Sequence, residues 1–222
     1  AADFDAEAVF VGHGIVAPEF GWNDYAGVDV KGKVVVLFTN EPPSEDAKFF
    51  AGRALTYYGR WTYKYEEAAR QGALGMIVIH ETDPASYGWA TVKNSNTNTM
   101  FDIVRPRPQD VHPLMEAWIQ RGVAVEMFRA AGLDFEAEKK KAQSADFRPV
   151  VIKDTSFTAD YRVKHAQVIS KNVVAMKKGS TLEDKADATG LFQVKLDAAK
   201  RQGLDINDPK LREKLMREAI DQ

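Results

Sequence analysis

Two short apolar runs constrain the fold of this 222-residue chain more than any other feature. The first is Val34–Phe38 and the second is Gly75–Ile79, and neither alternates with polar residues. Unbroken runs of this length are typical of strands buried on both faces, as in parallel sheets covered by helices. Between them, Thr62–Gln71 is rich in helix-forming residues, and Gly72 follows as a helix-ending signal. The sequence therefore predicts a strand–helix–strand unit with parallel pairing.

Weaker patterns surround this unit. Ala8–Val16 is apolar and β-branched and predicts a strand interrupted by glycine. The polar, turn-rich stretch between Pro84 and Pro113 predicts a long loop, and Leu114–Ala131 predicts a helix. A second helix is expected over Phe135–Gln143 with Asp134 as its N-cap, and further strands over Arg148–Ile152, Ser156–Val163 and Asn172–Met176.

The last part of the chain has a different character. After Gly179 strand patterns stop, and two amphipathic helices joined at Gly203 are expected. Asp208 followed by Pro209 is a good start signal for the second helix. We therefore divide the chain into residues 1–178 and a helical tail, residues 179–222, whose origin the sequence leaves open.

Composition excludes several classes of function. The chain is 45% hydrophobic and 28% charged, which is typical of a globular protein rather than a disordered one. Thirty Lys and Arg against 32 Asp and Glu give no electrostatic case for nucleic acid or an anionic membrane surface. No apolar run approaches the ~20 residues of a membrane helix. Without cysteine there are no disulfides, thiolate zinc sites or cysteine nucleophiles. Because Ala1 stands in place of an initiator Met, we expect a mature or excised chain.

Three motifs occur in an order and spacing that resemble a known family. They are Gly27–Val36, Tyr57–Ala69 and Gly72–Val78, preceded by the Gly-rich opening Val9–Glu19. Together they resemble the protease-associated domain, in the version inserted in bacterial zinc aminopeptidases related to glutamate carboxypeptidase. Ser170–Met176 is similar to the strand by which that family returns to its catalytic domain.

The resemblance implies a mixed α/β fold, with a protease-associated β-sandwich or barrel-like sheet, flanking helices and the C-terminal helical tail. It implies a non-catalytic lid that shapes substrate access and specificity in a zinc metallo-aminopeptidase. The expected partners are a peptide substrate and a catalytic peptidase domain. That domain would hold two zinc ions, and no cofactor is expected in this chain itself. Export of the parent enzyme to the periplasm, or its secretion, is implied by the resemblance alone.

The family's zinc ligands have no counterparts here. The family continues into a His-x-Asp ligand pair and ends its ligand set with another His, but this chain has no His-x-Asp and no histidine after His165. The segment around Asp187 only faintly resembles the family's bridging-Asp segment. A catalytic zinc needs three protein ligands, and the other histidines, His13, His80 and His112, are scattered along the chain. A Gly-x-Ser-x-Gly elbow and a Walker loop are absent as well. We predict no metal ligand and no catalytic residue.

An aromatic and basic cluster is the best candidate for ligand contact. Tyr57–Tyr65 contains five aromatic and two cationic residues within nine positions. Aromatic side chains offer a large contact area, and Arg can form two bonds to a carboxylate. In the family this loop faces the catalytic cleft. The residues expected to face the substrate are Arg60, Trp61, Tyr63, Lys64 and Trp89.

Two other functions are alternatives: the first would use the same aromatic loop, and the second would use residues that the sequence does not reveal. The chain could be a stand-alone peptide- or protein-binding module, which would retain peptide binding without a catalytic partner. It could also be a self-contained hydrolase, which metal-dependent turnover would reveal. A face left uncovered without the catalytic domain should be apolar, so a homodimer through that face is a further arrangement we keep open.

Overall fold

The computed structural model describes residues 2–171, 186 and 190–221. The chain divides into two compact units, Ala1–Lys164 and His165–Gln222. The boundary that the sequence suggested, at residues 178 and 179, lies outside the described residues, and so does the strand expected at Asn172–Met176.

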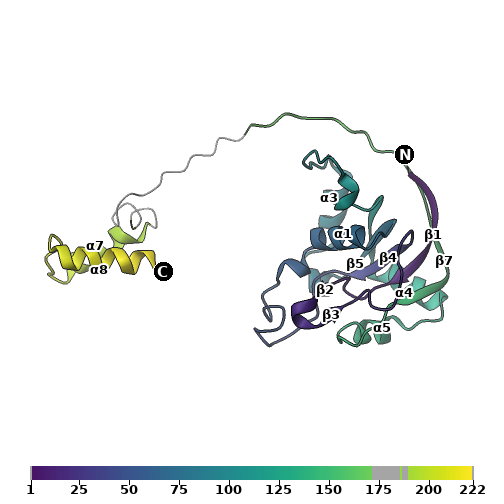
Figure 1. The fold of residues 1–222 in the computed structure, drawn as a ribbon, viewed down its shortest axis with the longest axis horizontal. Helices are drawn as coiled ribbons and strands as arrows, with labels where there is room; N and C mark the ends of the chain where they lie inside the picture. Colours follow the sequence, from purple (N-terminus) through teal and green to yellow (C-terminus); the bar gives the residue numbers. More distant parts are fainter. Residues whose placement is uncertain (1, 172–185, 187–189, 222) are drawn as a thin grey trace. The chain divides into compact units, whose positions relative to one another are not determined.

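Unit 1 is built on a five-stranded mixed sheet with the strand order β6-β5-β4-β1-β7 (Figure 1). Its strands are β1 (Ala2–Phe10), β4 (Val34–Phe38), β5 (Gly75–His80), β6 (Met115–Gln120) and β7 (Val150–Tyr161). Two short strands, β2 (Val16–Ala17) and β3 (Trp22–Asn23), pair separately in an antiparallel ribbon. The two apolar runs of the sequence are β4 and β5, and they pair in parallel as predicted.

The direction of the strands sets where a ligand site can form. β1, β4, β5 and β6 run parallel, with Val36 beside both Phe10 and Ile77. Only β7 is antiparallel, and its ladder with β1 runs from Phe10–Val150 to Ala2–Tyr161. The carboxyl ends of the four parallel strands therefore lie at one edge of the sheet, where open α/β sheets bind ligands.

β7 joins two predicted strands into one. The pairing with β1 jumps from Ala8–Ile152 to Glu7–Ser156, so three residues of β7 bulge out of the ladder. Asp154 at the centre of the bulge has a φ of 53°, in the left-handed region where Asp is tolerated better than most residues. The gap that we expected between the strands is this bulge.

Helices cover both faces of the sheet. The α-helices of unit 1 are α1 (Trp61–Arg70), α2 (Thr82–Ala85), α3 (Trp89–Thr97), α4 (Arg121–Ala130) and α5 (Phe135–Lys141). Single 3₁₀ turns occupy Pro18–Phe20, Tyr57–Gly59 and Pro108–Asp110. α5 begins as predicted, because the Asp134 side chain accepts a hydrogen bond from the Ala137 backbone N–H at 2.7 Å.

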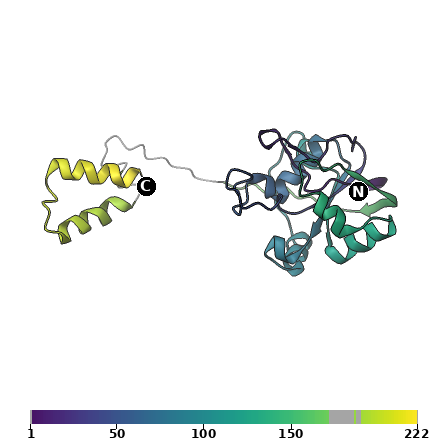
Figure 2. The same ribbon diagram turned by 90° about the horizontal axis from the view of Figure 1, so that it is seen from below.

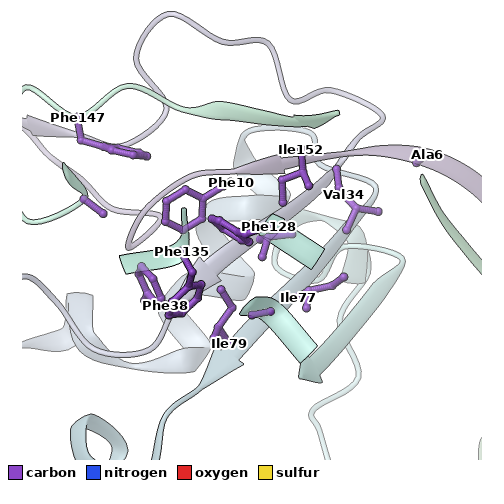
Figure 3. Close-up of a cluster of buried hydrophobic side chains, with 14 of the residues drawn as sticks. Ala6, Phe10, Val34, Phe38, Ile77, Ile79, Phe128, Phe135, Phe147 and Ile152 are labelled. Carbon is purple, nitrogen blue, oxygen red and sulfur yellow. The ribbon is translucent and has the colours of Figure 1, made fainter. Parts of the chain in front are cut away.

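The α4 and α5 face holds the larger core (Figure 3). Phe10 lies at its centre, with the rings of Phe38, Phe128 and Phe147 at centroid distances of 5.1 to 5.5 Å, all edge-on. Such edge-to-face pairs stabilise beyond the area they bury. Alternate residues of β4 and β5 point to the other face, where Tyr65 and Ala68 of α1 cover them. Both faces of the central strands are therefore dry, which explains their unbroken apolar sequence.

Three expectations need correction. The described strands form an open sheet with β6 and β7 at its edges, and not a barrel or two-sheet sandwich, because β4 and β5 are covered by helices rather than by another sheet. Leu114–Ala131 is β6 followed by α4, and not one helix. The long loop expected between Pro84 and Pro113 contains α3. Apolar runs without clear periodicity do not distinguish strand from helix, which explains the error at β6. The mixed α/β class itself is confirmed.

Unit 2 contains a helical hairpin of α7 (Leu191–Arg201) and α8 (Pro209–Ile220), which lie side by side (Figure 2). The predicted join is confirmed, since Gly203 has a φ of 75° at the end of α7. The predicted cap is confirmed as well, since the Asp208 carboxylate accepts from the Lys210 N–H at 3.0 Å. Phe192 and Leu196 of α7 pack with Ala219 of α8 in a small core. Within the described part of the chain, no helix is long and apolar enough to cross a membrane.

Candidate functional site

An aromatic groove lies on the α1 face of unit 1. Its volume is about 260 Å³. It is lined by Trp61, Tyr65, Tyr87, Thr91, Val92, Ser95, Asn96, Met100 and Trp118. None of these side chains is a carboxylate, an amine, a guanidine or an imidazole. The groove therefore suits an uncharged, flat or apolar group.

Contacts between α1 and β6 form the floor of this aromatic groove. Trp61 and Tyr65 are one helical turn apart on α1, with ring centroids 5.3 Å apart. The indole N–H of Trp118 on β6 donates to the Tyr65 hydroxyl at 2.8 Å. This bond pairs the indole N–H with the phenol oxygen beneath the groove, so the remaining surface is mostly apolar. Trp61 is 42% exposed and is the most accessible aromatic ring of the wall.

His80 lies at the carboxyl end of β5, within an aromatic cage. Its ring is 5.4 Å from the ring of Tyr87, 5.8 Å from Trp89 and 6.4 Å from Trp118. Burial lowers the pKa of His80, so its imidazole is neutral at pH 7. Both ring nitrogens are buried, and neither has a hydrogen-bond partner of normal geometry among the described residues. The cage therefore positions aromatic rings and offers no free charge to the groove.

An exposed apolar segment, Met100–Val104, continues from the wall of the groove. Met100 is 60% exposed and Phe101 81%, and Ile103 and Val104 are more than two-thirds exposed. The segment is anchored nevertheless. Asp102 within it contacts Arg105 at 2.6 Å and the His112 Nε2 at 3.1 Å, and the hydrogen bond from Arg105 lowers the pKa of Asp102.

His112 fastens this apolar segment to the sheet. Its Nδ1 lies 2.6 Å from Glu116 Oε1 on β6, while its Nε2 lies beside Asp102. Burial raises the pKa of Glu116. The exposed apolar residues thus lie on a segment that is held through Asp102 by contacts with Arg105 and His112.

The structure places the five expected substrate-facing residues in different surroundings. Trp61 lines the aromatic groove, and Trp89 is half-buried against His80 beside it. Arg60 is exposed at the N-cap position of α1. Tyr63 and Lys64 are buried on the inner side of α1. The structure thus brings Trp61 and Trp89 close to one site, leaves Arg60 exposed, and separates Tyr63 and Lys64 from the surface.

Lys64 requires a correction. We expected its ammonium group on the substrate-facing surface, but the residue is fully buried, and its Nζ has no hydrogen-bond partner among the described residues. Burial lowers the pKa of Lys64 to about 7, although the nearby carboxylates of Asp24 and Glu41 oppose the shift. Lys64 precedes Ala68 by four residues, and Ala68 packs against the sheet, so helical geometry turns both side chains inward.

Tyr63 has a structural role in place of the expected surface position. Its hydroxyl accepts from the Val16 N–H at 3.1 Å and donates to the Val16 carbonyl or to Glu67. Phe50, Trp22 and Ile15 pack around it. Tyr63 therefore ties α1 to β2 and contacts no open surface.

Sequence reasoning missed Tyr65, Tyr87, Trp118 and Met100 as groove residues. Trp118 was assigned to a helix, so its place on an edge strand beside α1 was not foreseen. Tyr87 and Met100 flank α3, which we read as a loop. A signal was present, since Trp61 and Tyr65 at helical spacing already defined an aromatic stripe.

No trio of His, Asp or Glu side chains in the described part of the chain is arranged to hold a metal ion. Comparisons with protein-family models, with curated proteins and with solved structures gave no match to this chain.

Proposed function

We propose that unit 1 is a protease-associated lid domain of a zinc metallo-aminopeptidase, non-catalytic in itself, which holds part of the peptide near a catalytic domain. The observation that carries the proposal is the aromatic groove continued by the exposed segment Met100–Val104. Contiguous exposed apolar residues on a folded domain typically mark a surface that contacts another protein or a ligand. The three sequence motifs resembling the family support the same assignment.

The division of labour within the site follows from its chemistry. The groove has no charged wall, so it suits the apolar or aromatic side chain of a peptide rather than its charged ends. Segment Met100–Val104 supplies four exposed apolar side chains, on either side of Asp102, for contact with a catalytic domain. In the complete enzyme the zinc ions would activate a water molecule, and this chain would contribute binding and orientation of the peptide.

A second apolar stretch supports the proposal. Residues 162–171 carry no helix or strand, and Val168 and Ile169 within them are 69% and 85% exposed. These residues immediately precede and enter Ser170–Met176, the segment similar to the family's return strand. Covering an Ile side chain that is this exposed with another protein surface would favour association, because apolar area is removed from water.

The first prediction concerns peptide binding by the isolated chain. A fluorescein-labelled tripeptide with a central Phe is expected to bind, and Trp61→Ala is expected to weaken binding by about tenfold or more, because an aromatic wall residue contributes on the order of 1–3 kcal/mol at such sites. The measurement is fluorescence anisotropy. Tyr57→Ala is the matched control, since Tyr57 is 55% exposed nearby but does not line the groove.

The competing peptide has Asp at the central position, and the uncharged groove should bind it more weakly. Equal binding of both peptides, or equal effects of the two substitutions, would contradict a substrate-holding groove. Nanomolar binding without any catalytic domain would instead favour a stand-alone peptide-binding module.

Metal content and turnover test the non-catalytic part of the proposal. We expect the purified chain to hydrolyse none of a panel of aminoacyl-nitroanilides and to contain no stoichiometric zinc by mass spectrometry. Stoichiometric zinc with chelator-sensitive turnover would establish a self-contained hydrolase.

A dimer that Phe101→Ser converts to a monomer would show that the apolar segment joins two copies of the chain.

A further inference from the structure

A second cavity lies at the carboxyl edge of the parallel strands, apart from the aromatic groove. Its volume is about 390 Å³, and residues following β1, β4 and β5 form its inner wall. The outer wall is the loop from Pro42 to Leu55, together with Pro84, Lys139 of α5 and Gln143 just after that helix. No residue lines both the cavity and the groove. The position is the one where open α/β sheets bind small ligands.

Two of the charged pairs on the cavity wall are already satisfied. Lys139 of α5 donates to both carboxylate oxygens of Glu81 at 2.7 Å. Arg53 donates to Glu45 at 2.7 Å at the outer rim. These four groups therefore neutralise one another and leave little net charge for a ligand to meet.

Glu41 is the wall carboxylate without such a partner. It is only 4% exposed, and no cation among the described residues lies within 4.0 Å of it, although the buried Lys64 acts on it from farther away. Its Oε1 accepts from the Thr56 N–H at 2.9 Å and its Oε2 from the Thr56 hydroxyl at 2.6 Å. Each carboxylate oxygen has two acceptor sites, so Glu41 can still accept from a donor in the cavity.

His13 adds a second polar group that cannot supply a positive charge. Its side chain lines the cavity and is 7% exposed, and its buried Nδ1 has no hydrogen-bond partner of normal geometry in the part of the chain that the structure describes. Burial, together with the positive charge of Lys64, lowers the pKa of His13 to about 3. The imidazole is therefore neutral under all ordinary conditions and does not repel a cation.

The remaining wall is apolar. Phe38, Leu55, Pro42, Pro43 and Pro84 surround the polar groups. The ring of Phe38 already faces the ammonium of Lys139 at 5.9 Å, and such faces attract cations. A ligand with one positive group and an apolar body would therefore meet complementary surfaces at both ends.

We propose that this cavity binds a primary ammonium group carried on a small apolar body, with Glu41 as the acceptor. A free alkylamine and the N-terminus of a peptide share this chemistry. The backbone around the site is also held in strained conformations, since Asn40, just after β4, has a φ of 61°, and Phe50 and Ala51 in the outer loop have φ values of 48° and 57°. Such strain is found where a loop is shaped for a ligand. The Asn40 side chain, which donates to the Pro84 carbonyl, joins the two sides of the cavity.

Four probes test the proposal by isothermal titration calorimetry with the full chain at pH 7, where an α-amino group is mostly protonated. They are leucinamide, N-acetylleucinamide, isoamylamine and the tripeptide Leu-Gly-Gly. Leucinamide is expected to bind. Its neutral acetylated form should bind at least about tenfold more weakly, or not detectably, because a charged hydrogen bond is lost. Tight binding of isoamylamine alone would identify free amines as the ligand class, whereas tight binding of the tripeptide would identify peptide N-termini.

Glu41→Gln removes the charge and keeps the shape, and it should weaken leucinamide binding about tenfold or more. Glu45→Gln is the matched control, because Glu45 lines the same cavity but is exposed and paired with Arg53. Its effect should stay within about twofold. Leu55→Trp narrows the cavity from a position that is 54% exposed, and it should weaken binding of every probe even where Glu41→Gln fails to fold.

Equal binding of leucinamide and N-acetylleucinamide would overturn the proposal, as would binding unchanged by Glu41→Gln in a folded variant or no binding of any probe at millimolar concentration. The result is independent of the lid function, since Trp61→Ala tests the aromatic groove and should leave leucinamide binding unchanged.

Discussion

Phe10→Ala is expected to lower the free energy of unfolding of unit 1 by about 3–5 kcal/mol, the range for removing a buried aromatic ring. Phe10 is fully buried, and three other phenylalanine rings contact it edge-on (Figure 3). Its loss would leave a cavity between the sheet, α4 and the segment of Phe147, all of which meet at this ring. Because the free energy of unfolding of a native domain is only about 5–15 kcal/mol, this single change would remove a large fraction of the stability of unit 1.

Urea unfolding followed by tryptophan fluorescence measures this effect in unit 1 specifically. All four tryptophans, Trp22, Trp61, Trp89 and Trp118, belong to unit 1. Phe101→Ala is the control, since Phe101 is 81% exposed and its loss should change stability by less than about 0.5 kcal/mol. Similar losses for the two variants would show that the core is not centred on Phe10.

Replacing His13 by Asn should make the chain less sensitive to acid. The unfolded chain takes up a proton at His13 below its ordinary pKa of 6.5, but the folded chain does so only near pH 3, because burial and Lys64 lower the pKa of His13. The unfolded state therefore binds more protons between these two pH values. The contribution of neutral His13 to the free energy of unfolding is complete above pH 6.5 and decreases as the pH drops toward 3. Between pH 7 and pH 5 the loss should be about 2 kcal/mol.

Asp24 acts in the opposite direction and serves as the control. Burial raises the pKa of Asp24 to about 6, so the folded state binds the extra proton between pH 6 and pH 3.8 and gains stability there. The wild-type profile contains both effects, while the His13→Asn and Asp24→Asn variants separate them. Between pH 7 and pH 5, the free energy of unfolding should therefore fall less in His13→Asn than in the wild type, and fall more in Asp24→Asn. A His13→Asn curve parallel to the wild type would show that His13 is accessible to protons in the folded state.

The central βαβ unit could be predicted from the sequence because its signals are local. The apolar runs of β4 and β5 and the glycine after α1 are each read within a few residues. β6 could not be predicted in the same way. Its residues Met115–Gln120 pass directly into α4, and only pairing with β5, set by parts of the chain about forty residues away, selects a strand there.

The candidate site shows the same limit. Trp61 was expected to face a substrate, and it lines a groove, but that groove is completed by Trp118 from an edge strand and Met100 from beyond α3. Lys64 was misplaced because a lysine is normally exposed, whereas helical position places this one beneath α1, with Asp24 and Glu41 as its compensating charges. Composition alone does not reveal a buried cation, because its cost is met by residues distant in the sequence.

The ladder between β1 and β7 has a topological consequence. Ala2 and Tyr161 are paired, so the two ends of the sheet domain emerge as neighbours about 5 Å apart. If unit 1 were inserted into another domain, its two ends would need attachment points only about as far apart as the two ends of a tight turn. The ladder between β1 and β7 thus gives unit 1 a geometry compatible with insertion into a surface turn of another domain, without moving apart the strands of that domain that flank the turn.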